Sequence, residues 1–308
     1  MQNPNNPLPV GTKVVLRTPT RAGPRTRPKG AVAQVVRNPQ EAGGDYRLRF
    51  TDGAEATVRR EDVAILSHFH RPDWERQEHP EGSEVLRKTV IYRCVVGSQA
   101  YGLADEESDV DRRGIYLPPA RMHWSLYGVP GQLEDKHTDE VYWEMQKFLK
   151  LALKANPNIL ECLYTPEVEH VHPLAAQLLD MREIFVSKLV YQTYNRYVLS
   201  QFKKLNRRFE KTGEINNKHA MHLVRLLLSG ITILEEGFVP VDVADWRDRL
   251  LAIKDGEVDW EEVDAWRLEL HERFDAVFQT SDLPERPDYE RANEFLVEAR
   301  LWAVDGWE

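Results

Sequence analysis

The feature that most restricts this chain is a buried strand that ends at a glycine. Residues 89–96, TVIYRCVV, are apolar at nearly every position, as in a strand covered on both faces of its sheet. Gly97 and Ser98 end this run, and a second short strand, RGIYL at 113–117, follows before a pair of prolines. Such strands need helices to cover them, so this part of the chain is predicted to be an α/β (α+β) fold with a short mixed sheet.

Two acidic residues, Asp109 and Asp111, directly precede the second strand and are predicted to extend it. Side chains at i and i+2 of a strand share a face, so these carboxylates should project together about 7 Å apart, with Val110 pointing into the core. Like charges this close are costly unless a cation lies between them. Bound Mg²⁺ (or Mn²⁺) is the usual solution in phosphoryl transfer, which makes both residues candidate metal ligands.

The glycine and serine that end the first strand suggest a phosphate site. Gly97 lets a phosphate approach the backbone closely, and the Ser98 hydroxyl and the neighbouring amides can donate to its oxygens. Gly-Ser alone has little meaning, but here it precedes Asp109 by a short spacer within one continuous block. We therefore predict that Gly97 and Ser98 bind the outer phosphates of a nucleotide.

This block resembles the nucleotidyltransferase superfamily, whose pattern is an apolar strand, Gly-Ser, a short spacer and Asp-x-Asp on the next strand. More narrowly, it resembles the RNA repair pathway DNA polymerase β family. That family shows Gly-Ser-x-Ala-Tyr-Gly-Leu-Ala, Ser-Asp-x-Asp-x-Arg-Gly and a later Asn-Pro-x-x-x-Glu. The matching segments here are 97–104, 108–114 and 156–161, with further similarity at 199–205 and 216–228, so the resemblance covers roughly residues 88–240.

The resemblance implies a metal-dependent enzyme that moves a nucleoside monophosphate from an NTP to an acceptor hydroxyl and releases pyrophosphate. An RNA 3′ end is the first choice of acceptor. A protein side chain or a small molecule, such as an aminoglycoside, is the alternative. A third hypothesis is a non-catalytic nucleotide or RNA binder that keeps the fold.

The superfamily usually has a third carboxylate on the strand after Asp-x-Asp, where it helps to hold the metal and can accept the proton of the attacking hydroxyl. The resemblance assigns this role to Asp139, in the segment TDEVYW. Glu140 is the reserve, because a register error of one residue would exchange the two faces. The structural alternative is that Asp139 caps the helix that follows.

A row of cationic or ionisable side chains lies further along the chain. Lys218, His222 and Arg225 occur at i, i+4 and i+7 and so share one helix face. Facing a cleft, they would hold a triphosphate by charge-assisted hydrogen bonds, as the resemblance also implies. The alternative is a solvated basic helix face.

The N-terminal segment, residues 1–66, has a different pattern of short β-rich runs separated by Gly, Pro and Asn. This pattern predicts a small SH3-like β-barrel, outside the family resemblance. Residues 67–87 are predicted to be a linker, whose histidines are solvated rather than metal-bound. The predicted strands are 12–17, 31–36, 45–50 and 55–58, and the histidines are His68, His70 and His79.

The predicted catalytic domain spans residues 88–170, and a helical domain spans 171–308. In the catalytic domain, TDEVYW should be extended and lead into an amphipathic helix that the Asn-Pro-Asn at 156–158 stops. In the helical domain, apolar residues recur at helical spacing. The predicted helices are 173–182, 184–211, 216–236, 244–254, 260–279 and 288–304.

Charge is distributed unevenly between these parts. Residues 1–66 contain 11 Lys and Arg against 6 Asp and Glu, whereas the remainder contains 30 against 44. A basic head can deliver RNA, and Arg21, Arg25, Arg27 and Lys29 gather in one predicted loop of it; chance composition is the alternative. No apolar run approaches a membrane span, and two cysteines in apolar surroundings predict reduced thiols in a cytoplasmic protein.

Overall fold

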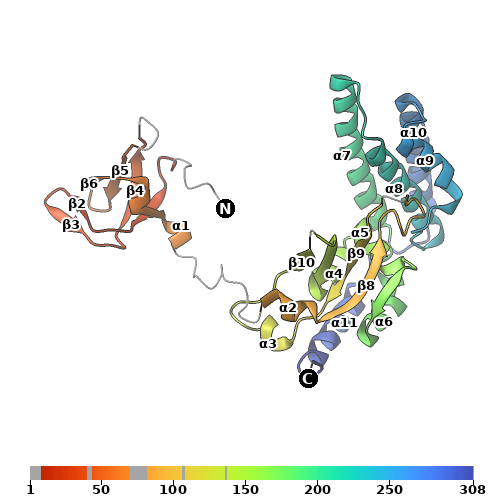
Figure 1. The fold of residues 1–308 in the computed structure, drawn as a ribbon, viewed down its shortest axis with the longest axis horizontal. Coiled ribbons are helices and arrows are strands. Elements are labelled where there is room, and N and C mark those ends of the chain that lie inside the picture. Colours follow the sequence, from red (N-terminus) through yellow and green to blue (C-terminus); the bar gives the residue numbers. More distant parts are fainter. Residues whose placement is uncertain (1–7, 40–43, 70–81, 106–107, 136, 308) are drawn as a thin grey trace. The chain divides into compact units, whose positions relative to one another are not determined.

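The computed structural model of this chain divides into two compact units, Met1–Glu78 and His79–Glu308. Figure 1 shows the helices and strands of each unit. The residues that the structure describes are 8–39, 44–69, 82–105, 108–135 and 137–307. The predicted solvated histidines of the linker cannot be followed here: His70 and His79 lie outside the described residues, and the side chain of His68 is not described.

The N-terminal unit is built on a five-stranded antiparallel sheet with the order β6-β5-β4-β1-β7. Its central strands alternate buried and exposed side chains, as a half-buried strand requires. The short strands β2 and β3 form a separate hairpin, and α1 (Leu66–Phe69) follows the sheet. The strand bounds are β1 Lys13–Leu16, β2 Thr20–Ala22, β3 Arg25–Arg27, β4 Val32–Arg37, β5 Tyr46–Phe50, β6 Glu55–Val58 and β7 Val63–Ile65.

The four strands predicted for this unit are found near their expected positions, but the closed SH3-like barrel is not confirmed. Within the described residues, the edge strands β6 and β7 do not pair with one another. The basic segment 21–29, predicted as a loop, forms most of the β2–β3 hairpin and the turn after it. In it Arg27 pairs with Asp52 and lies over the Phe50 ring, while the other three cations are exposed.

The second unit contains a mixed five-stranded sheet with the order β10-β11-β9-β8-β12. β9 and β11 are parallel, and the other neighbours are antiparallel. The predicted short mixed sheet with helices is therefore confirmed. The apolar strand β8 lies inside the sheet, as its composition requires (Figure 1). The bounds are β8 Val90–Val96, β9 Asp111–Tyr116, β10 Gln132–Asp135, β11 Glu140–Glu144 and β12 Val168–Val171.

Short helices follow and flank this sheet. Glu144 caps α4 (Met145–Ala152) by accepting hydrogen bonds from the amides of Gln146 and Lys147. The sequence prediction for Asn156 was incomplete, because this residue does more than stop α4. Its side chain caps the next helix, α5 (Pro157–Tyr164), which has its proline in the first turn. Two further short helices are α2 (Gly82–Arg87) and α3 (Ala120–His123).

Helix α8 is buried along most of its length and is the centre of the helical part of this unit. Helices α7, α9 and α10 pack against it. Gly230 of α8 lets the Phe274 ring of α10 approach, because a side chain at position 230 would overlap that ring. These helices share one hydrophobic core with the sheet. The bounds are α6 Pro173–Asp180, α7 Leu189–Thr212, α8 Asn217–Glu236, α9 Arg247–Asp255, α10 Trp260–Thr280 and α11 Tyr289–Trp302.

Cys94 and Cys162 are buried and form no disulfide. Among the described helices, none combines the length and the apolar character needed to cross a bilayer.

Candidate active site

A pocket of about 430 Å³ lies where β9 begins and where the first turns of α8 face it. It brings together six of the eight residues that the sequence predicts for the site. We call it the aspartate pocket. Its lining residues are Ser98, Leu103, Asp105, Ser108, Asp109, Asp111, Asp139, Lys218, Met221, His222 and Lys254.

Gly97 and Asp111 face each other across the two central strands. Gly97 directly follows β8, and Asp111 opens β9 in register with Val96. Gly97 has a φ of +74°, in the left-handed region, and a Cβ atom there would overlap the Asp111 carboxylate. Glycine is therefore required twice at this position, by the backbone conformation and by the space that the carboxylate occupies.

Asp139 lies beside Asp111 because β11 is parallel to β9. The ladder starts with Glu140 opposite Arg112, and the carbonyl of Asp139 accepts a hydrogen bond from the Arg112 amide at 3.2 Å. Asp139 has a φ of +48°, which aspartate tolerates better than most residues. It does not cap a helix, since α4 starts at Met145. Glu140 accepts from the Tyr142 hydroxyl at 3.1 Å and lies outside the pocket lining.

One guanidinium bridges the two carboxylates. Arg113 Nη2 donates to Asp111 Oδ1 at 2.9 Å and to Asp139 Oδ1 at 3.3 Å. Burial and then the neighbouring Asp139 raise the pKa of the Asp111 carboxyl, and Arg113 opposes this rise. Two carboxylates are thus held together at the edge of a pocket, with a cation offsetting their repulsion.

Asp109 reaches the same pocket by a different route from the one predicted. β9 begins only at Asp111, so the two aspartates do not share a strand. Val110 is 36% exposed and does not enter the core, which corrects the expected alternation. The segment before β9 is irregular, and strand periodicity does not apply to it.

The opposite wall of the pocket comes from helices. Lys218 and His222 lie on the first turns of α8, as the helical spacing predicts. Burial, followed by the positive charges of Arg225 and Lys218, lowers the pKa of His222 to about 4. Its imidazole is therefore neutral near pH 7 and can offer hydrogen bonds but not a charge.

Arg225 shares this helix face but lies beneath the pocket. Its side chain is 5% exposed, and Nη1 is 2.8 Å from Glu161 Oε1. The guanidinium also lies over the Tyr101 ring at 3.7 Å, and the Tyr101 hydroxyl donates to Glu161 at 2.5 Å. This buried network fastens the loop after Gly97 to α5 and α8. Arg225 thus positions the loop and does not itself line the pocket.

Lys254 of α9 is a pocket residue that the sequence analysis missed. Its ammonium pairs with Asp105 at 2.6 Å, and both side chains line the pocket. No local motif marks this lysine, because only the packing of α9 against α8 brings it close. The pocket wall opposite the aspartates therefore carries two lysines, Lys218 and Lys254.

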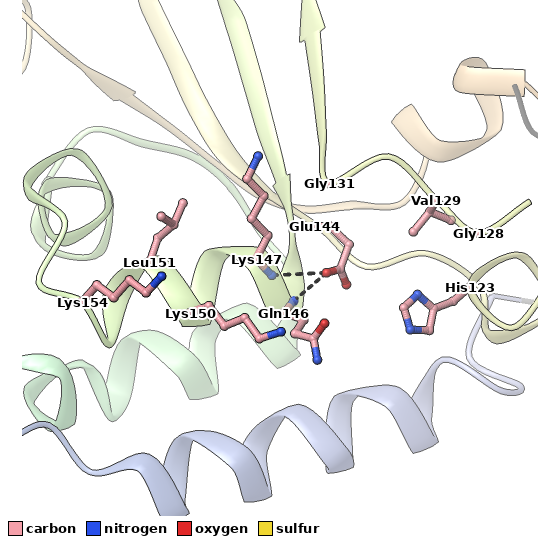
Figure 2. A pocket seen from close by; sticks show the side chains of 10 residues that line it. All are labelled: His123, Gly128, Val129, Gly131, Glu144, Gln146, Lys147, Lys150, Leu151 and Lys154. Atoms are coloured by element: carbon pink, nitrogen blue, oxygen red, sulfur yellow. Dashed lines mark hydrogen bonds between the residues drawn. The ribbon is translucent and has the colours of Figure 1, made fainter. Parts of the chain in front are cut away.

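A second pocket, of about 520 Å³, lies at the other end of β11 (Figure 2). We call it the lysine pocket. Its carboxylate, Glu144, caps α4 and pairs with Arg300. None of the residues predicted for the site lines it. The lining residues are His123, Gly128, Val129, Gly131, Glu144, Gln146, Lys147, Lys150, Leu151 and Lys154.

Residues 66–298 match the family described as the RNA repair pathway DNA polymerase beta family. The match covers most of the chain, and the protein belongs to this family. The matched residues include every residue of both pockets and exclude the N-terminal sheet, which ends at Ile65.

Three proteins with related sequences are described as uncharacterised proteins. The chain is 24% identical over 222 residues to YcgL of Bacillus subtilis (strain 168), covering 68% of this chain and 84% of that protein. It is 24% identical over 170 residues to MJ0002 of Methanocaldococcus jannaschii, covering 53% and 68%. It is 32% identical over 89 residues to a 38.9 kDa protein in the nrdC-mobD intergenic region of Enterobacteria phage T4, covering 26% of each.

Proposed function

We propose that this protein is a metal-dependent nucleotidyltransferase that transfers a nucleoside monophosphate from an NTP to the 3′ hydroxyl of an RNA. The observation that carries the proposal is the aspartate pocket, where Asp111 and Asp139 meet opposite Lys218 and Lys254. Clustered carboxylates facing a cationic wall suit a substrate that combines a divalent cation with a polyphosphate.

The carboxylates suit a hard divalent cation such as Mg²⁺ or Mn²⁺. Asp111 and Asp139 would hold it, with Asp109 beside them, and the space left by Gly97 keeps the Asp111 carboxylate accessible. Within the described part of the chain, no three His, Cys, Asp or Glu side chains form a ready metal cage. Mg²⁺ usually uses one or two carboxylates together with substrate phosphates, so a full protein cage is not required. When bound, the cation would neutralise charge on the reacting phosphates.

The remaining residues would hold and orient the nucleotide. Ser98 and the backbone after Gly97 would donate to the outer phosphates, which Lys218 and Lys254 would contact from the other wall. The neutral His222 would add a hydrogen bond. Buried Arg225 would keep the loop after Gly97 in place through Glu161 and Tyr101. Most of the rate would come from this positioning.

The proposed reaction is a single displacement at phosphorus. The acceptor hydroxyl oxygen bonds to the α-phosphorus, and the bond from that phosphorus to the oxygen bridging to the β-phosphate breaks. Pyrophosphate leaves with the electron pair, and the hydroxyl proton passes to the Asp139 carboxylate. Asp139 lies at the rim of the pocket, where an acceptor can reach it.

Family membership supports RNA as the acceptor. A second support is the basic segment 21–29 of the N-terminal unit, where Arg21 and Arg25 of the β2–β3 hairpin and Lys29 just after it are exposed. Exposed cations of this kind can contact a phosphate backbone. A protein or a small-molecule acceptor remains the alternative, as does nucleotide binding without transfer.

The test is to incubate the full-length protein with Mg²⁺ and each NTP labelled at the α-phosphate, together with either single-stranded RNA or a cell lysate. We expect label on the RNA, lost on chelation of the metal and in Asp111→Asn. Label on lysate protein instead would select the alternative acceptor. Bound nucleotide with no label on any acceptor would contradict the proposal.

A further inference from the structure

Helix α7 carries a concentration of positive charge that the proposed reaction does not use. Between residues 196 and 211 it has six Lys and Arg and a single acidic residue, Glu210. Residues 235–308, by contrast, contain 22 Asp and Glu against 8 Lys and Arg. The basic side chains of α7 therefore stand out in a unit whose C-terminal helices are acidic.

The cations lie on the outer face of the helix. The residues of α7 that enter the core include Tyr194, Val198 and Phe202, and the six basic residues are all exposed. Among the described residues, one of the six has a carboxylate partner within 4.0 Å, and this pair, Arg208–Glu214, is itself exposed. We call these six residues the α7 basic face: Arg196, Lys203, Lys204, Arg207, Arg208 and Lys211.

The basic face is linked to the start of α8, which lines the aspartate pocket. A turn of four residues, 213–216, joins α7 to α8, and the two helices pack against each other (Figure 1). The C-terminal half of α7, where most of the cations lie, is thus the half nearest in the chain to Lys218 and His222. Lys204 also lies close enough to His219 to contribute, after burial, to lowering the pKa of that imidazole.

We propose that the α7 basic face binds the phosphate backbone of a single-stranded RNA whose 3′ end enters the aspartate pocket. This inference rests on the proposed function and names the surface that holds the acceptor. The cations are spread over about 22 Å of helix, which suits a polyanion and not a single phosphate. Tyr197, 44% exposed beside them, offers a ring on which a base can stack.

The lysine pocket supplies a matched comparison. Lys150 lies on α4, and Lys154 lies in the turn that follows this helix. Neither has a carboxylate partner within 4.0 Å among the described residues, and both lie at the far end of β11 from Asp139. Two double variants, Lys203→Gln with Arg207→Gln and Lys150→Gln with Lys154→Gln, remove the same charge from different surfaces. Exposed changes of this kind should leave the melting temperature close to that of the wild type.

The measurement is the anisotropy of a fluorescent single-stranded RNA titrated with the full-length protein, without NTP, over a salt series. The α7 double variant should bind RNA at least about tenfold more weakly at low salt. Its slope of log affinity against log salt should fall by about 1.4, which corresponds to two lost phosphate contacts on a single strand. The lysine-pocket variant should match the wild type.

Three results would overturn this inference: no RNA binding by the wild type, equal binding by the wild type and the α7 variant, or equal losses in both variants. Displacement of RNA by polyglutamate at the same concentration of charge would also overturn it, in favour of an acidic protein partner. RNA binding through α7 without any transfer of label would contradict the proposed function and leave this inference standing. If the α7 double variant transferred label to RNA as well as the wild type, the proposed function would stand and this inference would be contradicted.

Discussion

At one end of β11, Asp139 lies beside the Asp111 carboxylate at a pocket of about 430 Å³; at the other end, Glu144 lies at a pocket of about 520 Å³. Glu144 is fully used by the fold, because it accepts two amides at the start of α4 and pairs with the part-buried Arg300. Asp111 instead has a like charge as a neighbour, and Arg113 alone offsets it at hydrogen-bond distance among the described residues.

The two ends differ in how the protein neutralises the carboxylate, and this difference does not follow the size of the pocket. A carboxylate surrounded by donors is stabilised by the protein and contributes to its stability. Carboxylates that crowd together are stabilised further by a cation from outside, which is what a metal-binding site needs. Crowded carboxylates of this kind, Asp111 and Asp139, lie at the aspartate pocket, which is the smaller of the two.

The largest expected effect comes from substituting one carboxylate at each end of β11 and comparing the two variants. Asp111→Asn should lower nucleotidyl transfer by at least about a thousand-fold, because several kcal/mol of charge stabilisation is lost. Its melting temperature should stay the same or rise, since the repulsion from Asp139 is relieved. Label transfer and thermal unfolding measure the two quantities.

Glu144→Gln is the counterpart. It weakens a cap and an ion pair, so we expect about 2–3 kcal/mol less stability with little change in kcat. The comparison fails if Asp111→Asn unfolds the protein while Glu144→Gln leaves its stability unchanged.

A smaller effect is expected from adding one methyl group at each end. Gly97→Ala places a Cβ against the Asp111 carboxylate, and Gly128→Ala places one in open space at the lysine pocket. The φ values, +74° and +60°, are both left-handed, so the backbone strain should be similar, about 1–2 kcal/mol. Displacement of Asp111 should lower kcat about a hundred-fold in Gly97→Ala only. Equal kinetics in the two variants would show that the space at Gly97 does not matter.

The smallest expected effect concerns one lysine in each pocket. Lys218→Ala should weaken NTP binding about tenfold, the value of one charge-assisted hydrogen bond, and should change NMP binding much less. The reason is that Lys218 is proposed to contact the outer phosphates, which an NMP lacks. Lys150→Ala should change neither affinity. Calorimetry with both ligands measures this, and equal losses for NTP and NMP in Lys218→Ala would assign that lysine another role.

The sequence determined the local features of this protein. Continuous apolar character identified β8, helical spacing located α8 and α10 nearly to the residue, and the Gly-Ser and Asp-x-Asp block indicated the family. These features depend on neighbours within a few turns or on a short motif, so a single sequence contains them.

Only the tertiary structure decided which side chains meet. Asp139 lies beside Asp111 because two strands pair in parallel, and Lys254 enters the pocket because α9 packs on α8. Arg225 is buried because it pairs with Glu161 of α5, and Val110 is exposed because the segment before β9 is irregular. Periodicity gives the face of an element on which a residue lies. What that face meets depends on contacts between segments far apart in the chain, which no local pattern encodes.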